Sequence, residues 1–90
     1  MNLEKFMNKK VLIRTYSAGV HFGTLLEIDG IELRLGNARR LWSWEGALSL
    51  SEVASTGVNI DKSKISVPVE EIILPSYIEM LPLTSNLSKL

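Results

Sequence analysis

The stretch VHFGTLLEIDGIELRL, residues 20–35, decides the predicted fold, because its apolar side chains recur at every second position around one tight turn. Asp29-Gly30 lies between Ile28 and Ile31. This dipeptide is typical of a type I′ turn, whose two central residues both need a positive φ. We therefore expect two half-buried antiparallel strands joined as a hairpin.

The same alternation extends the sheet on both sides of this hairpin. Residues 11–16 alternate in the same way, and the small residues 17–19 end in a glycine that can take a positive φ, which predicts a second hairpin. Gly36-Asn37 makes the next break. Residues 38–44, with the sequence ARRLWSW, follow as a fourth strand.

A short helix is predicted in the second half of the chain, where the alternation ends. Ser49 and Glu52 have the S-x-x-E spacing of a capping box, and Leu48 and Val53 stand at the two positions of a hydrophobic staple. We expect a helix over residues 50–56 that packs its apolar face against the sheet.

Three short β-rich pieces follow the helix, over residues 65–69, 72–74 and 77–81. Pro68 lacks an N–H and so places its piece at an edge or a bend. Together with the first four strands, these pieces complete a single sheet.

The predicted fold is therefore α+β and mainly β, in a single domain over residues 1–90. We expect a small twisted antiparallel sheet or SH3-like partial barrel of about five to six strands with one short helix. The ordered core is expected over about residues 8–83, and a loose polar tail over residues 84–90.

Composition and charge narrow the classes of function. The 90 residues include 10 lysines and arginines, 10 aspartates and glutamates, one histidine and no cysteine. A zero net charge gives no broad basic field, which disfavours a long DNA or RNA partner. One histidine and no cysteine predict no metal site. No apolar run reaches the roughly 20 residues of a membrane span, and no signal-peptide core follows the first residues, so we expect a cytosolic protein without a membrane partner.

Association between copies is expected for two reasons. A chain of 90 residues without disulfides or metals has a thin margin of stability, which a second copy would increase. Leu12, Leu25 and Leu41 also lie on strand faces opposite the main apolar stripe, where a partner would cover them. We therefore predict a compact homo-oligomer.

Residues 38–44 hold the strongest candidate for a binding site. If this segment is a strand, Arg40, Trp42 and Trp44 share one face, while Arg39 points to the other and could serve a neighbouring subunit. A guanidinium offers a fork of donors to phosphate oxygens, and an indole offers a stacking surface to a base. The alternative is that both tryptophans belong to the core and the arginine stem covers their rings.

The first hairpin adds further candidates. His21 lies beside a glycine on the polar face of its strand, where it could donate to a phosphate or a base edge. Arg14 and Tyr16 share a face one period apart, and Ser17 lies at the hairpin tip. These side chains could join one ligand site, or they could be ordinary solvated surface.

Motifs for catalysis are scarce. The sequence has no G-x-S-x-G elbow, no H-E-x-x-H pair and no phosphate-binding G-x-x-x-x-G-K loop. Glu70 and Glu71 are adjacent, and neighbours on a strand point to opposite faces, which disfavours an acid/base dyad. We expect a binding protein that is not an enzyme and uses no cofactor.

Three parts of the sequence resemble a widespread group of small bacteriophage and prophage proteins. They are residues 14–23 (RTYSAGVHFG), residues 37–50 (NARRLWSWEGALSL) and the ending with Ile73-Leu74 and Ile78-Glu79. The likeness covers residues 10–83. Ser43 stands where this group commonly has an aromatic residue. The resemblance implies a protein that a phage produces in the host cytoplasm and that acts by binding host molecules.

In scale and chemistry the chain is similar to anti-defence sponges, which are oligomeric phage proteins that sequester a cyclic nucleotide messenger of CBASS or Thoeris immunity without cleaving it. The implied ligand is a small anionic nucleotide of the cyclic dinucleotide or cyclic ADP-ribose type. One alternative is a module that docks on and inhibits a host protein, with Trp42, Trp44 and Tyr16 as anchors. A structural accessory of the virion or of the replication machinery is a third.

Overall fold

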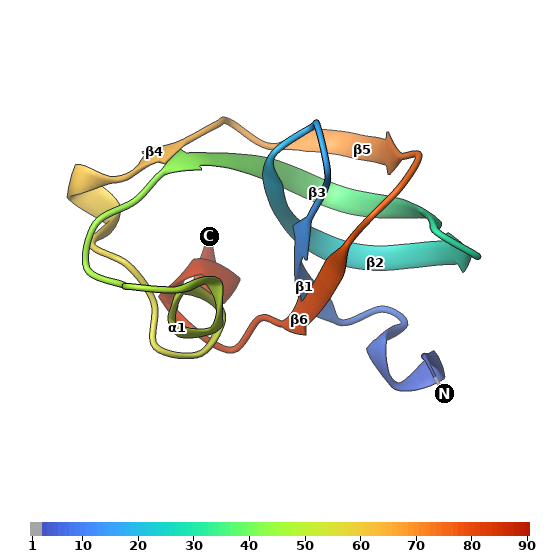
Figure 1. Cartoon of the computed structure of the whole chain (residues 1–90), viewed down its shortest axis with the longest axis horizontal. Coiled ribbons are helices and arrows are strands. Elements are labelled where there is room, and N and C mark those ends of the chain that lie inside the picture. The colour runs from blue at the N-terminus through green and yellow to red at the C-terminus, as the bar shows by residue number, and fades with distance from the viewer. Residues whose placement is uncertain (1–2) are drawn as a thin grey trace.

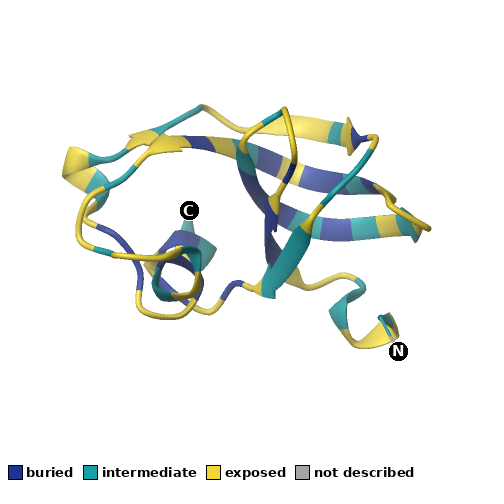
Figure 2. Ribbon diagram, viewed as in Figure 1, coloured by how far each residue is buried: buried dark blue, intermediate teal, exposed yellow. Residues whose placement is uncertain are grey.

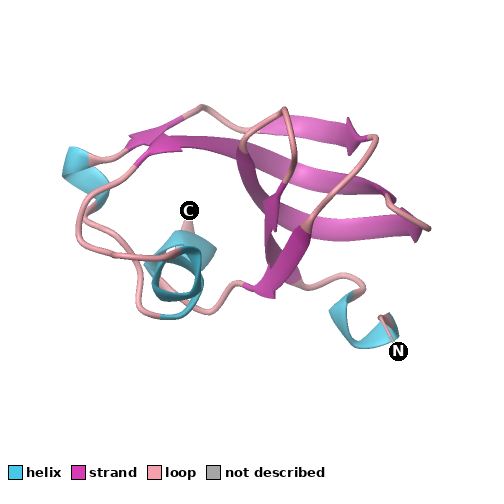
Figure 3. Ribbon diagram, viewed as in Figure 1, coloured by secondary structure: helices cyan, strands magenta, loops and turns pink. Residues whose placement is uncertain are grey.

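The computed structural model describes residues 3–90, so Met1 and Asn2 lie outside the described residues. Over residues 3–90 the chain forms a six-stranded antiparallel open sheet with one short α-helix and three 3-10 turns, which confirms the predicted mainly β fold (Figures 1 and 3). The elements in chain order are η1 (Glu4–Phe6), β1 (Lys10–Arg14), β2 (Val20–Asp29), β3 (Glu32–Ser43), α1 (Leu50–Ser55), η2 (Ile60–Lys62), β4 (Lys64–Ile65), β5 (Val69–Leu74), β6 (Glu79–Pro82) and η3 (Asn86–Lys89).

The long strand β3 organises the sheet. The strands pair in the order β4-β3-β2-β1-β6, and β5 also pairs with β3. Two parts of β3 serve these two partners, since Leu41 and Ser43 pair with β4 while the earlier residues 33–38 pair with β5. Figure 1 shows β4 and β5 following each other along β3.

The central hairpin forms where the sequence predicts it, but its turn differs by one residue. Asp29 pairs with Glu32, so Gly30 and Ile31 are the two central residues of the turn. Gly30 has a φ of +61°, and Ile31 is not among the residues with a positive φ. A glycine at the first central position is typical of a type II′ turn, so the predicted type I′ turn on Asp29-Gly30 is wrong.

A β-bulge changes the direction of the side chains in the middle of β3. Phe22 pairs with Arg39, whereas Thr24 pairs with Gly36, so β3 carries one extra residue against β2. Asn37 lies in this interval with a φ of +47°. A bulge bends the strand and re-aims the side chains that follow it, so simple alternation no longer holds along β3.

Part of each face of the sheet is buried, while most of β5 is exposed (Figure 2). One face packs with α1 and the C-terminal segment in the helix-side core, which contains Leu12, Phe22, Leu41, Val53, Ala54, Val58, Leu83 and Leu87. The other face encloses the strand-side core, which contains Val11, Ile13, Leu25, Leu33, Leu35, Ala38 and Leu74. The predicted half-burial is wrong for residues 11–13 of β1 and 21–23 of β2, which are buried on both faces, whereas residues 26–29 of β2 keep the predicted alternation.

The two cores remove one argument for association. Leu12 and Leu41 lie in the helix-side core, and Leu25 lies in the strand-side core. The expectation that a second copy covers these leucines is wrong, because α1 and the curled sheet cover them within one chain.

The predicted helix forms as α1. The hydroxyl of Ser49 accepts a hydrogen bond from the Glu52 backbone N–H at 3.2 Å, as an N-cap residue does. The staple is wrong, since Leu48 is 94 % exposed while Val53 is buried. Within residues 3–90, no helix has the length and apolarity that crossing a membrane requires.

The C-terminal tail is anchored. Leu87 is buried in the helix-side core, and the Asn86 side chain bonds both backbone groups of Val58, donating to the carbonyl at 2.8 Å and accepting from the N–H at 3.2 Å. The prediction of a loose tail over residues 84–90 is wrong, because its two leucines cover the end of the helix-side core.

Candidate functional site

A hollow of about 220 Å³ lies on the strand-side face where β3 passes β2, β4 and β5. We call it the β3 cavity. Its lining residues are His21, Ala38, Arg39, Arg40, Trp42, Ser66, Val67, Val69 and Ile72. Four of the eight side chains predicted to bind a ligand therefore meet in one place.

The two tryptophans of the segment separate. Trp42 lies on β3 at the β3 cavity and is 63 % exposed. β3 ends at Ser43, and Trp44 turns to the other side, where it packs against the helix-side core and donates its indole N–H to the Ala47 carbonyl at 3.2 Å. The expectation that Arg40, Trp42 and Trp44 share one face is wrong, because strand alternation stops where the strand stops.

The two arginines also separate. Nη1 of Arg39 donates to the Ser66 carbonyl at 3.2 Å, and its Nε is buried without a hydrogen-bond partner in residues 3–90. Arg40 is exposed, and its guanidinium makes no hydrogen bond or ion pair with any described residue. Arg40 is therefore the charge at this cavity that is available to a ligand.

Ser66 fixes the linker between β4 and β5 to β3. Its hydroxyl accepts from the Arg40 backbone N–H at 2.8 Å, and its own N–H donates to the Arg40 carbonyl at 2.9 Å. These bonds hold Val67 beside the cavity. The sequence gives one signal for this wall, the bend at Pro68, but no pattern in it places Ser66 opposite Arg40.

His21 forms the buried floor of the cavity. It pairs across the sheet with Ile13 on one side and Arg40 on the other, and it is 1 % exposed. The prediction of a polar-face position is wrong, because both faces of β2 are covered at residues 21–23. Nε2 lies 2.9 Å from the Ala18 carbonyl oxygen, which can only accept, so this nitrogen carries the proton.

The pKa of His21 is lowered from its ordinary value of 6.5. Burial is the largest cause, and the positive charge of Arg40 lowers the pKa further, while the hydrogen bond to Ala18 raises it in part. His21 is therefore neutral at pH 7. Arg39 and Arg40 supply the positive charge of the cavity.

The remaining predicted residues lie outside the β3 cavity. Nε of Arg14 is 3.5 Å from the Glu79 carboxylate, and Tyr16 is 87 % exposed near the hairpin tip with Ser17. Thr15 holds this tip, since its hydroxyl donates to the Gly19 carbonyl at 2.8 Å and accepts from the Ala18 N–H at 2.9 Å. The structure does not bring Arg14, Tyr16 or Ser17 to the ligand candidate.

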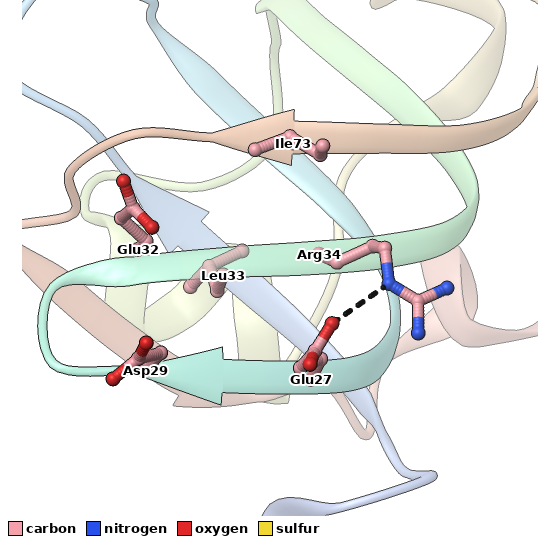
Figure 4. Close-up of a pocket in the computed structure, with 6 residues that line it drawn as sticks. All are labelled: Glu27, Asp29, Glu32, Leu33, Arg34 and Ile73. Atoms are coloured by element: carbon pink, nitrogen blue, oxygen red, sulfur yellow. Dashed lines mark hydrogen bonds and ion pairs between the residues drawn. The ribbon is translucent and has the colours of Figure 1, made fainter.

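A second hollow lies at the β2–β3 turn and gathers acidic side chains (Figure 4). Arg34 donates to the Glu27 carboxylate at 3.2 Å and also pairs with Glu71 on β5. Asp29 and Glu32 lie at the turn end, away from this ion pair (Figure 4). Within the described residues, no group of three His, Cys, Asp or Glu side chains could hold a metal ion.

The chain matches the model of a family described as a domain of unknown function (DUF6948) over residues 8–89. The match covers most of the chain. The description gives neither a phage origin nor an activity. No curated protein and no solved structure matches the chain.

Proposed function

The chain belongs to the DUF6948 family, and we propose that it is a non-catalytic binding protein that sequesters a small anionic nucleotide at the β3 cavity. One observation carries this proposal. An arginine whose guanidinium has no partner among residues 3–90 and a largely exposed tryptophan stand two residues apart on one strand, beside the same hollow. Arg40 would bind phosphate oxygens, and the Trp42 ring would stack on the base.

The rest of the cavity suits a ligand with one charged and one flat end. Val67, Val69 and Ile72 give it apolar walls. Because His21 is neutral, the charge of the cavity comes from the two arginines and is positive. A positive charge favours the binding of an anion over that of a neutral base. This distribution resembles ordinary small-molecule sites, where apolar walls surround a few placed polar groups.

The size of the cavity bears on the class of nucleotide. At about 220 Å³ it is smaller than the roughly 300–1,000 Å³ of sites that enclose a drug-sized ligand. It suits one base with its phosphate. A cyclic dinucleotide has two such units, so two protomers related by a two-fold axis would each contribute one Arg40 and one Trp42. This shared ligand is our remaining reason to propose a homo-oligomer.

The biological setting is part of the same proposal. In this setting the protein is a phage-encoded sponge that removes a cyclic nucleotide immune signal, of the cyclic dinucleotide or cyclic ADP-ribose type. The resemblance of residues 14–23 and 37–50 to phage and prophage proteins supports this setting.

A second candidate function is the docking of a host protein on the same surface. Trp42 and Val67 are exposed apolar side chains at the cavity, and exposed aromatic residues beside an arginine are typical anchors of protein interfaces. Trp44 and Tyr16 do not join this surface, since one packs inward and the other lies at the hairpin tip.

The test is an NMR titration with AMP, a cyclic dinucleotide and cyclic ADP-ribose. The chain has two tryptophans and hence two indole N–H signals. We expect the Trp42 signal to shift and the Trp44 signal, which is bonded to Ala47, to stay. Arg40→Gln should weaken binding about ten- to hundredfold, because it removes a charge-assisted phosphate contact.

Lys62→Gln is the matched control, since Lys62 is an exposed cation on η2 that lines none of the three hollows. It should bind like the parent. Binding that survives Arg40→Gln, or no binding of any of the three nucleotides, would contradict the proposal. Heat denaturation of the complex should release intact nucleotide, and a cleaved product would show an enzyme.

A further inference from the structure

A third hollow, of about 400 Å³, lies between the N-terminal and C-terminal segments of the chain. We call it the lysine cavity. Its lining residues are Lys5, Phe6, Lys9, Lys10, Pro82, Leu83 and Thr84. The backbone N–H of Leu83 donates to the Lys10 carbonyl at 3.0 Å, so the start of β1 and the chain after β6 are joined at this point.

The positions of two of the three lysines are fixed by contacts. Nζ of Lys10 donates to the Ser88 carbonyl on η3, and Nζ of Lys5 lies 5.4 Å from the centre of the Phe6 ring. An ammonium over an aromatic face is held by a cation–π interaction. The ammonium group of Lys9 makes no hydrogen bond or ion pair with the described residues.

The described residues that line this cavity carry positive charge only. Three of the ten lysines and arginines line it, and its lining includes no aspartate or glutamate. Arg34 in the turn hollow shows the opposite arrangement, with two carboxylates as partners. Like charges that gather without acidic partners repel one another, and a bound anion relieves that repulsion.

The floor of the cavity is apolar. Leu83 is buried in the helix-side core, and Phe6 packs against the strand-side core. Inorganic phosphate would use only the ammonium groups. A ligand with an apolar body would also cover Phe6 and Pro82, which gains roughly 25 cal/mol per Å² of apolar surface removed from water.

We propose that the lysine cavity is a binding site for a small organic anion, a phosphate or carboxylate that carries one aromatic or aliphatic group. This site is distinct from the β3 cavity and does not depend on the function proposed for it. No residue lines both hollows.

The experiment is an NMR titration of the full chain with phenyl phosphate, inorganic phosphate and benzyl alcohol. Phenyl phosphate should saturate and shift the amides of Phe6, Leu83 and Thr84, and it should bind at least about threefold more tightly than either of the other probes. Lys9→Gln should weaken phenyl phosphate binding about two- to fivefold, the effect of losing an exposed charge pair. Lys62→Gln should leave it unchanged.

Three results would overturn the proposal. They are equal binding of inorganic and phenyl phosphate, equal weakening by Lys9→Gln and Lys62→Gln, and shifts scattered over the surface. Co-sedimentation with vesicles of anionic phospholipid that Lys9→Gln abolishes would assign the lysines to a membrane surface and would also overturn it. Arg40→Gln should not alter phenyl phosphate binding, so this test is independent of the nucleotide titration.

Discussion

Trp42 and Trp44 are two residues apart in the sequence, yet they lie in opposite surroundings. Trp42 stands on β3 and is largely exposed, beside the β3 cavity and Arg40. Trp44 lies past the end of β3, packs against the helix-side core and bonds its indole N–H to Ala47. The same residue type is therefore exposed beside a hollow on one side of the sheet and packed against a core on the other.

The difference between the two sides follows from where the hydrogen-bonded ladder ends. Ser43 is the last residue of β3, and the chain then crosses towards α1. Beyond that point no pairing partner fixes the direction of a side chain, and burial against α1 decides it. The side of Trp42 keeps exposed polar groups beside the β3 cavity, while on the side of Trp44 the apolar contacts are made within the chain.

The largest expected effect is on stability. Trp44→Ala should lower the free energy of unfolding by about 3 kcal/mol, at the lower end for a large aromatic residue because the ring is only partly buried. Trp42→Ala should change it by less than about 1 kcal/mol, as surface substitutions do. Urea denaturation of both variants measures the difference.

Equal destabilisation by the two substitutions would break the comparison. It would show that Trp42 contributes to the core, and the proposed nucleotide site would then lack a stacking surface.

Local rules predict the parts of this fold that depend on a few neighbouring residues. The Asp29–Glu32 hairpin and the Ser49 cap each need only a turn residue or a hydroxyl at the right spacing. The face of Trp44 and the anchoring of Asn86 to Val58 depend on contacts between distant segments. No period in the sequence contains those contacts.

The candidate site was predictable in its centre and not in its walls. Residues 38–42 form a strand as expected, so Arg40 and Trp42 share a face. The bulge at Asn37 and the linker residue Ser66 give the hollow its shape, and neither follows from alternation. Alternation predicts a surface position for His21, because the sequence gives no sign that both faces of β2 are covered around this residue.

A smaller loss of stability is expected from a substitution at the β-bulge between β2 and β3. A Cβ on Gly23 would lie 2.8 Å from the Gly36 carbonyl oxygen and 3.1 Å from Cα of Ala38, and both are backbone atoms that cannot move aside cheaply. Gly23→Ala should therefore cost about 1–3 kcal/mol, as overpacking does. Ser43→Ala, at an exposed position on the neighbouring strand β3, should cost less than about 0.5 kcal/mol.

Thermal melts and the NMR signal of the Trp42 indole N–H test this prediction together. We expect Gly23→Ala to shift the Trp42 signal more than the Trp44 signal, since the displaced backbone leads to the side of Trp42. A Gly23→Ala protein that melts like the parent would show that the bulge can relax, and the shape of the β3 cavity would then not depend on it.

The smallest expected effect is a dependence of stability on pH, caused by His21 at the floor of the β3 cavity. The pKa of His21 is lowered in the folded chain, mainly by burial, from the 6.5 expected when unfolded. Well above pH 6.5 the imidazole is neutral in both the folded and the unfolded chain, so it does not change the free energy of unfolding. As the pH falls below 6.5, the unfolded chain takes up a proton that the folded chain refuses, so stability declines until the pH passes the lowered folded pKa.

The single histidine makes this prediction measurable without assignment of overlapping signals. An NMR titration of the imidazole should give a folded pKa below 6.5, and His21→Gln should flatten the decline in melting temperature between about pH 7 and the lowered pKa. Arg40→Gln should raise the pKa of His21, because it removes the positive charge paired across the sheet, and a nucleotide phosphate bound at Arg40 should raise it in the same direction. An imidazole that titrates at or above 6.5 in the free protein would show that the floor of the β3 cavity is open to water. The difference between the two sides of the sheet would then be one of degree.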